Sequence, residues 1–390
     1  MSEIPAQEPV SSLYVHVPFC AQKCEYCAFF SEAAKGVTVN RYVDALIREM
    51  ELVASDLKPK TIFFGGGTPS LLNLRQWESI LSTLQRLGLS GAMERTVECN
   101  PATVSLEKAK LLRQGGVNRI SMGVQSLDEH LLDRLGRVHS RDMVFKSFDT
   151  LRAAGFDNIN LDLMFAIPGQ TMEVWKKTLA EAVALGSEHL SCYEVIYEED
   201  TPLYQQLQAR EFDVNEELAC AMYDELLAAA DANGFQQYEI ANFARHLSSE
   251  VGEVPDRACQ HNINYWRGGS FYGLGPSAAG YVRGLRTKNW SNTVLYCEQL
   301  ERGQRAIESR EELKPLSRAG EIAAFGLRMN AGWPLIEFRQ RTGFELGDEW
   351  KSEISRMIGL EYASLDEKRF QLTPRGLRYA DWAAEQFLRI

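Results

Sequence analysis

Three cysteines lie close together near the start of the chain, in the stretch PFCAQKCEYCAFF. Cys20, Cys24 and Cys27 follow the spacing C-x3-C-x2-C. A structural zinc site needs four ligands, commonly two separated C-x2-C pairs, and the sequence has no second pair. A thioredoxin-like C-x2-C motif would leave Cys20 unexplained. Three thiolates instead suit a [4Fe–4S] cluster with one open iron, which could bind a ligand that carries both an amine and a carboxylate.

The composition limits the class of protein. The chain has 390 residues, of which 45% are hydrophobic and 24% are charged, so it can form a large core and two or three domains. A net charge of −11 argues against non-specific nucleic-acid binding. The five other cysteines are scattered, which excludes a disulfide scaffold. The first ten residues lack the features of a signal peptide, and no apolar run reaches the roughly 18 residues of a transmembrane helix. With thiols kept reduced, the composition indicates a cytoplasmic or organellar-matrix protein, and we expect a cytoplasmic one.

Strand-like and helix-like segments alternate through the first half of the chain. Helices are predicted between the strands, at 40–57, 73–87, 105–116 and 171–186, with two short helical stretches before Gly155. Such alternation predicts an α/β fold with a parallel sheet, either open or curled into a barrel. The predicted strands are 12–17, 61–67, 95–101, 118–126, 158–165 and 189–196.

Unusual residues stand at the ends of these predicted strands. In parallel α/β folds, binding and catalytic groups gather at the carboxyl ends of the strands. The sequence therefore predicts one site at that edge of the sheet. The residues at the strand ends are Cys20, Gly65–Gly67, Glu98, Gln125 and Asp162.

With Tyr26 in its aromatic position, the C-x3-C-x-aromatic-C motif resembles that of the radical S-adenosylmethionine (SAM) superfamily. The resemblance implies that the three cysteines hold a [4Fe–4S] cluster and that SAM chelates its open iron. It also implies that the reduced cluster cleaves SAM to a 5′-deoxyadenosyl radical. The stretch FFGGGTPS (63–70) resembles the glycine segment of the family, whose backbone meets the amino group of SAM. Its candidates are Gly66, Gly67 and Thr68.

The segments VECNP, SMGVQS, LGRVH and DLMFAIPGQ resemble one subfamily in order and spacing. They contribute Glu98, Gln125, Arg137 and Asp162, which the resemblance implies contact SAM. The residue types fit this role, since a carboxylate can pair with an ammonium, an arginine with a carboxylate, and an aspartate with ribose hydroxyls. Tyr14, on the strand before the cysteine loop, is expected to border the bound cofactor.

That subfamily is the oxygen-independent coproporphyrinogen III oxidase group. It contains oxidases that decarboxylate the propionates of a porphyrinogen, and HemW-type proteins understood as heme chaperones. The oxidases resemble C-x3-C-x2-C-x-C, whereas Phe29 occupies the fourth cysteine position here. They also carry a long arm ahead of the cluster, whereas 19 residues precede Cys20 in this chain. Both differences favour the chaperone type.

The stretch HNINYW (261–266) matches the chaperone-type motif H-N-x-x-Y-W. The resemblance implies that His261 binds heme iron through a neutral imidazole nitrogen, with the aromatic rings against the macrocycle. Some relatives carry a histidine where this chain has Ala279, so no second heme ligand is assigned.

These resemblances imply a partial (β/α)6 TIM-like barrel with a C-terminal extension and a small winged-helix-like domain. Residues 1–200 would form the barrel with the cluster and SAM sites, 201–314 an extension with the heme motif, and 315–390 the small domain. The implied function is heme delivery to acceptor hemoproteins such as membrane respiratory enzymes, which this chain would meet peripherally. An electron donor such as a flavodoxin or ferredoxin would reduce the cluster.

Alternative functions stay open at this stage. The chain could be an oxygen-independent coproporphyrinogen III oxidase, although we do not expect that activity. It could also be another radical SAM enzyme such as a methyltransferase, which would leave HNINYW unexplained, or a zinc or scaffold protein. Whether the chain cleaves SAM, and so is an enzyme, is left open.

Overall fold

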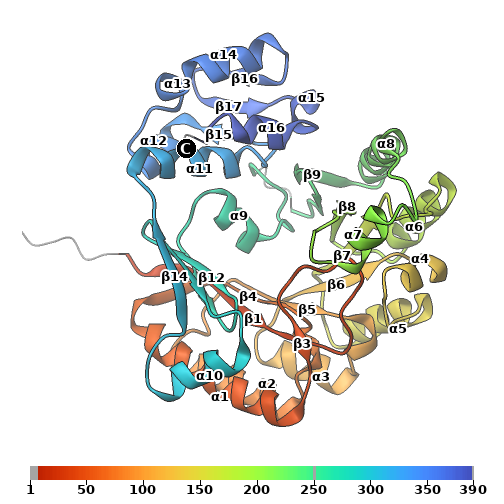
Figure 1. The fold of residues 1–390 in the computed structure, drawn as a ribbon, viewed down its shortest axis with the longest axis vertical. Helices are drawn as coiled ribbons and strands as arrows, with labels where there is room; N and C mark the ends of the chain where they lie inside the picture. Colours follow the sequence, from red (N-terminus) through yellow and green to blue (C-terminus); the bar gives the residue numbers. More distant parts are fainter. Residues whose placement is uncertain (1–7, 249–251, 389–390) are drawn as a thin grey trace, which may run out of the picture.

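The computed structural model describes residues 8–248 and 252–388 of the chain. Its centre is a nine-stranded sheet with the order β11-β1-β4-β5-β6-β7-β8-β10-β9. The seven strands from β11 to β8 are parallel, and β10 and β9 add an antiparallel hairpin at one edge. The sheet curves and its helices cover the outer face, as in a partial barrel (Figure 1). The predicted fold class is confirmed. The first seven residues, part of the segment judged to lack a signal peptide, lie outside the described range.

All six predicted strands are present and alternate with helices. The strands are β1 Val10–Val17, β4 Leu57–Gly66, β5 Glu94–Cys99, β6 Arg119–Gln125, β7 Ile159–Phe165 and β8 His189–Glu194. The helices are α1 Gly36–Val53, α2 Leu74–Arg86, α3 Leu106–Gln114, α4 Glu129–Arg134, α5 Arg141–Ala153 and α6 Met172–Ala184. As expected, Ser105 caps α3 by accepting a hydrogen bond from the Lys108 amide.

One predicted boundary is wrong. The first helix was expected over 40–57, but α1 ends at Val53, and after the short turn η1 Ala54–Asp56 the strand β4 begins at Leu57. Pro59 has no amide hydrogen to continue a helix. Residues 57–61 instead alternate between buried and exposed, which is the two-residue period of a strand.

Each central strand separates apolar from polar side chains by the same alternation. In β6, Ile120, Met122 and Val124 pack into the main hydrophobic core beneath the helices. Arg119 and Gln125 point to the opposite face, into the barrel interior. The apolar face stabilises the fold, and the other face is left for polar groups.

After residue 200 the chain returns to the barrel. Segments β9 Phe235–Glu239, β10 Asn242–Arg245 and β11 Tyr272–Leu274 join the central sheet, with β11 beside β1. Helix α9 Gln260–Trp266 carries the HNINYW motif. The other elements are α7 Pro202–Gln208, α8 Glu216–Ala232, α10 Thr293–Glu301, and the separate sheet of β12 Ala279–Val282, β13 Leu285–Asn289 and β14 Ile307–Glu312.

The C-terminal part has a hydrophobic core of its own, which includes Trp333, Trp350 and Phe370. Helices surround a three-stranded antiparallel sheet, an arrangement like a winged helix (Figure 1). Helix α11 packs against α9 and so joins this part to the motif. Its elements are α11 Pro315–Gly326, β15 Trp333–Pro334, α12 Leu335–Thr342, α13 Leu346–Glu349, α14 Lys351–Gly359, β16 Ala363–Leu365, β17 Arg369–Leu372, α15 Pro374–Leu377 and α16 Ala380–Glu385.

A buried carboxylate of α1 binds the segment after β11 to the barrel. Glu49 of α1 is fully buried, and its Oε2 accepts hydrogen bonds from the Gly275 amide at 2.9 Å and the Tyr296 hydroxyl at 2.7 Å. Its Oε1 accepts from Asn289 Nδ2 at 2.9 Å. Burial raises the pKa of Glu49, and these donors offset part of the cost of burying its charge.

Replacing Glu49 with alanine should lower the free energy of unfolding by about 3 kcal/mol, because several buried donors would lose their acceptor. Urea denaturation followed by circular dichroism measures this loss. The matched control is Glu51→Ala, which removes only an exposed ion pair with Arg86 and should cost less than about 1 kcal/mol. Equal effects of the two substitutions would contradict this role of Glu49.

Candidate functional site

A cavity of about 650 Å³ opens at the carboxyl ends of the parallel strands. All thirteen site residues singled out from the sequence line it, including the three cysteines of the motif. They come from the cysteine loop, from five neighbouring strands, from the segment after α4 and from α9. The curvature of the sheet brings these distant segments together, as the positions at the strand ends predicted. We call this space the cysteine cavity.

The cysteine loop is held at both ends and in its middle. The short strands β2 Phe19–Cys20 and β3 Glu32–Ala33 pair with each other and close the loop. The Glu25 amide donates to the Leu135 carbonyl at the end of α4, and the Glu25 carbonyl accepts from the Leu203 amide. Cys20, Cys24 and Cys27 are therefore fixed at the cavity, partly exposed and not in disulfides.

The surroundings of the thiols fit a cluster better than a single metal ion. Thr68 Oγ1 lies 3.6 Å from Cys20 Sγ, and Arg137 Nη1 lies 3.5 Å from Cys24 Sγ, so each can donate to a thiolate. The described residues contain no group of three His, Cys, Asp or Glu side chains arranged around one ion. In a cubane the three cysteines bind three different irons and need not converge on one point. The residues present thus fit a [4Fe–4S] cluster.

The glycine segment, Gly66 and Gly67, lines the cavity with main-chain atoms because these residues have no side chains. Gly66 has a φ of +106°, and a Cβ there would collide with the His16 ring. A Cβ on Gly67 would lie 2.8 Å from the Val17 carbonyl oxygen. The Gly66 amide already donates to Glu98 and the Gly67 amide to Val17. A bound ammonium would therefore meet the carbonyl oxygens of this segment, since it can only donate.

Two carboxylates face the cavity from neighbouring parts of the sheet. Glu98 Oε2 accepts from the Gly66 amide at 3.0 Å, and Asp162 Oδ1 accepts from Asn160 Nδ2 at 2.7 Å. Burial, followed by the negative charge of Asp162, raises the pKa of Glu98 to about 8. Burial also raises the pKa of Asp162. A cationic ligand would favour the ionised form of both groups.

The remaining predicted side chains surround these carboxylates. Gln125, at the end of β6, has a φ of +66°, a conformation that residues other than glycine seldom adopt and that is found mostly where structure or function requires it. Arg137 Nη2 donates to the Gly123 carbonyl at 2.6 Å. The Tyr14 hydroxyl lies 3.0 Å from His16 Nδ1. Tyr26 packs on a small apolar cluster beneath the cysteine loop.

Sequence reasoning missed several other polar residues of this cavity. Those on strands share the inward face of the sheet, at even spacing from the predicted residues of β6 and β7. The two-residue period was the signal that could have identified them. They are Arg119 and Ser121 of β6, Asn160 of β7 and Ser191 of β8.

His261 lies at the inner wall of the cysteine cavity. Its Nδ1 is 2.9 Å from Thr61 Oγ1, its Nε2 is 2.7 Å from the Tyr265 hydroxyl, and its ring stacks on Phe63. Burial lowers the pKa of His261 to about 3, so the ring is neutral at neutral pH. Because both nitrogens are hydrogen-bonded, one of these two hydroxyl groups must move before this ring can bind a metal.

Comparisons with known proteins agree with this geometry. The radical SAM superfamily profile matches residues 14–182, and the HemN C-terminal domain profile matches residues 313–379. The chain is 33% identical to heme chaperone HemW of Lactococcus lactis over 98% of both chains. It is 34% identical to HemW of Bacillus subtilis, with 94% of this chain and 96% of that one aligned. The chain belongs to the HemW family of radical SAM proteins.

A solved structure supports the fold. Coproporphyrinogen III oxidase HemN of Escherichia coli superposes with a TM-score of 0.82 at 21% identity, covering 98% of this chain and 90% of that one. Membership of the radical SAM superfamily implies a [4Fe–4S] cluster and SAM as cofactors. No helix in the described part of the chain is long and apolar enough to cross a membrane.

Alanine at Cys20, Cys24 or Cys27 should remove most of the bound iron after anaerobic reconstitution, because each thiolate would hold a separate iron of the cluster. Iron analysis and the visible absorbance of the cluster measure the loss. Cys220→Ala is the matched control, since Cys220 is an exposed thiol outside the cavity and should keep the iron of the wild type. Full iron content in the three loop variants would refute the assignment.

The affinity of the reconstituted protein for SAM should rise from about pH 7 to about pH 9, as Glu98 loses its proton near its raised pKa and can then pair with the positively charged cofactor. Glu98→Gln should bind SAM about tenfold more weakly and show a smaller rise. Calorimetry at several pH values compares the two proteins. The same pH profile in both would show that Glu98 does not titrate with SAM binding.

Proposed function

We propose that this chain is a heme chaperone, which binds heme and delivers it to acceptor hemoproteins such as respiratory enzymes. The observation that carries the proposal is the similarity, over nearly the full length, to several proteins named heme chaperone HemW. Phe29 in place of a fourth cysteine and the HNINYW stretch agree with this reading.

The surroundings of His261 support its role as a ligand of heme iron. Iron binds a neutral imidazole, and burial keeps this ring neutral. Metal-binding histidines usually have the second ring nitrogen held by a hydrogen bond, and Thr61 Oγ1 supplies such a partner at Nδ1. Nε2 is then the ligand atom, and Tyr265, which lines the cysteine cavity, is the group that must release it.

The mouth of the cysteine cavity suits an apolar macrocycle. Phe29 and Ile196 are 68% and 67% exposed, and Val138 and Tyr193 are exposed beside the same cavity. Large apolar side chains that remain in water around an opening mark a binding surface. Heme entering here would cover them before it reached Tyr265 and His261.

The same cavity would hold the cofactors that the family implies. Cys20, Cys24 and Cys27 would hold the cluster, which when bound can supply an electron to SAM. Glu98, Asp162 and the glycine segment would orient SAM and keep water away from it. Heme and SAM would thus lie in one cavity of about 650 Å³, so each should alter the binding of the other. Delivery also needs an acceptor hemoprotein, and cleavage of SAM needs an electron donor such as a flavodoxin or ferredoxin.

Heme titration of reconstituted protein tests the ligand assignment. His261→Ala should weaken heme binding by about tenfold or more, because the iron loses its ligand. Tyr265→Phe keeps the aromatic ring but frees Nε2, so it should bind heme at least as tightly as the wild type. Visible absorbance spectra measure heme binding by both variants. Wild-type affinity in His261→Ala would exclude this ligand, and strong weakening in Tyr265→Phe would show that the tyrosine hydroxyl itself binds heme.

The oxidase alternative makes a different prediction. An oxygen-independent coproporphyrinogen III oxidase would consume coproporphyrinogen III under anaerobic conditions with SAM and a strong reductant. We expect no consumption by this chain, together with stoichiometric heme binding. Turnover of the porphyrinogen without stable heme binding would overturn the chaperone proposal.

A further inference from the structure

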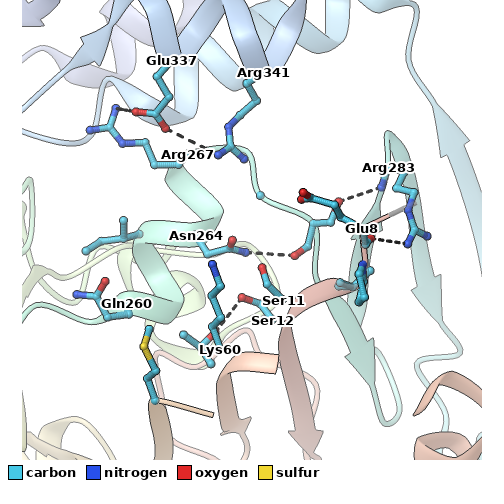
Figure 2. A pocket seen from close by; sticks show the side chains of 17 residues that line it. Glu8, Ser11, Ser12, Lys60, Gln260, Asn264, Arg267, Arg283, Glu337 and Arg341 are labelled. Atoms are coloured by element: carbon cyan, nitrogen blue, oxygen red, sulfur yellow. Dashed lines mark hydrogen bonds and ion pairs between the residues drawn. The ribbon is translucent and has the colours of Figure 1, made fainter. Parts of the chain in front are cut away.

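A second cavity, of about 640 Å³, lies on the other side of α9 (Figure 2). It is near the amino end of β1, at the level of Ser12 and Lys60, and so faces away from the carboxyl ends of the strands. Gln260 and Asn264 of α9 line this second cavity, whereas His261 of the same helix lines the cysteine cavity. Helix α9 therefore forms a wall shared by two cavities, and no part of the proposed function uses the second one.

Cationic side chains reach into the second cavity from separate parts of the chain. Figure 2 shows Lys60 of β4 and Arg341 of α12 pointing into it from opposite sides. Within the described residues, the Lys60 ammonium has no hydrogen-bond or ion-pair partner. Among the same described residues, the Arg341 guanidinium has only a 3.8 Å ion pair with Glu337 of its own helix. Both charges are therefore available to a ligand.

Arg267 adds a buried charge to the wall. Its side chain is only 8% exposed, and its Nη1 donates to the Gly332 carbonyl at 2.7 Å. Arg267 has ion pairs with Glu253, 3.1 Å from Nη2, and with Glu337, 4.0 Å from Nη1, but its Nη2 has no partner with hydrogen-bond geometry. A buried guanidinium with an unused donor is costly unless a further acceptor is supplied. The cavity beside Arg267 is where that acceptor could bind.

The balance of the lining is positive and polar. Four cationic residues stand against the two acidic ones, Glu8 and Glu337. Three of the four already have ion pairs: Arg283 with Asp56 at 2.6 Å, Arg267 with Glu253 at 3.1 Å and Arg341 with Glu337 at 3.8 Å. Hydroxyl and amide groups from β1 and α9 make up much of the remaining wall. Such a lining suits oxyanions and does not suit the apolar macrocycle of heme.

We propose that the second cavity binds a small polyanion, a molecule with two or more phosphate or carboxylate groups, held between Lys60 and Arg341. The ligand joins the barrel to the C-terminal part and lies against the polar face of α9. It is also close to the heme motif, because Ser12 Oγ bonds Thr61 Oγ1 at 2.8 Å and Thr61 bonds His261 at 2.9 Å. Neither Lys60 nor Arg341 belongs to the proposed heme site, and the His261 ring faces the other cavity.

Calorimetric titration of the full chain with pyrophosphate and with citrate, at constant ionic strength, tests the proposal. We expect at least one of them to bind saturably at a stoichiometry of one. Tighter binding of pyrophosphate would indicate a phosphate site, and tighter binding of citrate a carboxylate site. Lys60→Gln and Arg341→Gln should each weaken that binding about tenfold, because each removes a charged contact. Saturation by neither probe would overturn the proposal.

Matched controls separate this site from general charge effects. Lys58→Gln changes an exposed lysine of the same strand, and Arg339→Gln an exposed arginine of the same helix, and neither residue lines the cavity. Both controls should bind the probe like the wild type. Equal weakening in controls and test variants would show non-specific attraction and would refute the site. Thermal melts of all four variants should match the wild type, since each altered side chain is exposed.

Discussion

The polar interior of the barrel is the constraint on which the rest of this structure depends. Ionisable groups that face the interior of the curved sheet lose water, so each must find another partner or change its protonation. Glu98 takes the Gly66 amide as a partner and has a raised pKa. His189 lies between Asn160 and Tyr238, and burial lowers its pKa well below the usual value. Asn160 also donates to Asp162, so a carboxylate of the site and the buried His189 share one hydrogen-bond network.

That network extends beyond the barrel strands to α9, the helix with the HNINYW motif. The Tyr238 hydroxyl accepts from the Cys259 amide at the start of α9, and Glu94 accepts from the amides of Gln260 and His261. The inner end of α9 is thus fixed by side chains of β5 and β9. A helix of seven residues has little stability of its own, so these contacts determine its position.

The barrel strands and the cysteine site could be predicted from the sequence because their signals are local. Strand periodicity, glycine runs and the spacing of Cys20, Cys24 and Cys27 need no knowledge of distant contacts. The position of β11 could not be predicted, because a three-residue strand pairs with β1 through Leu13 and Tyr272, far apart in the chain. The second cavity could not be predicted for the same reason. In the sequence Lys60 and Arg341 are ordinary surface charges, and only the packing of the C-terminal part beside α9 brings them to one cavity.

The two opposite faces of α9 have a thermodynamic consequence. If a ligand in either cavity displaces this short helix, the binding free energy of the other cavity changes as well. Linkage then requires that each ligand alter the affinity of the other by the same factor. A cell metabolite on the polar face would then tune how readily the chain takes up or releases its cargo, without touching the cargo itself.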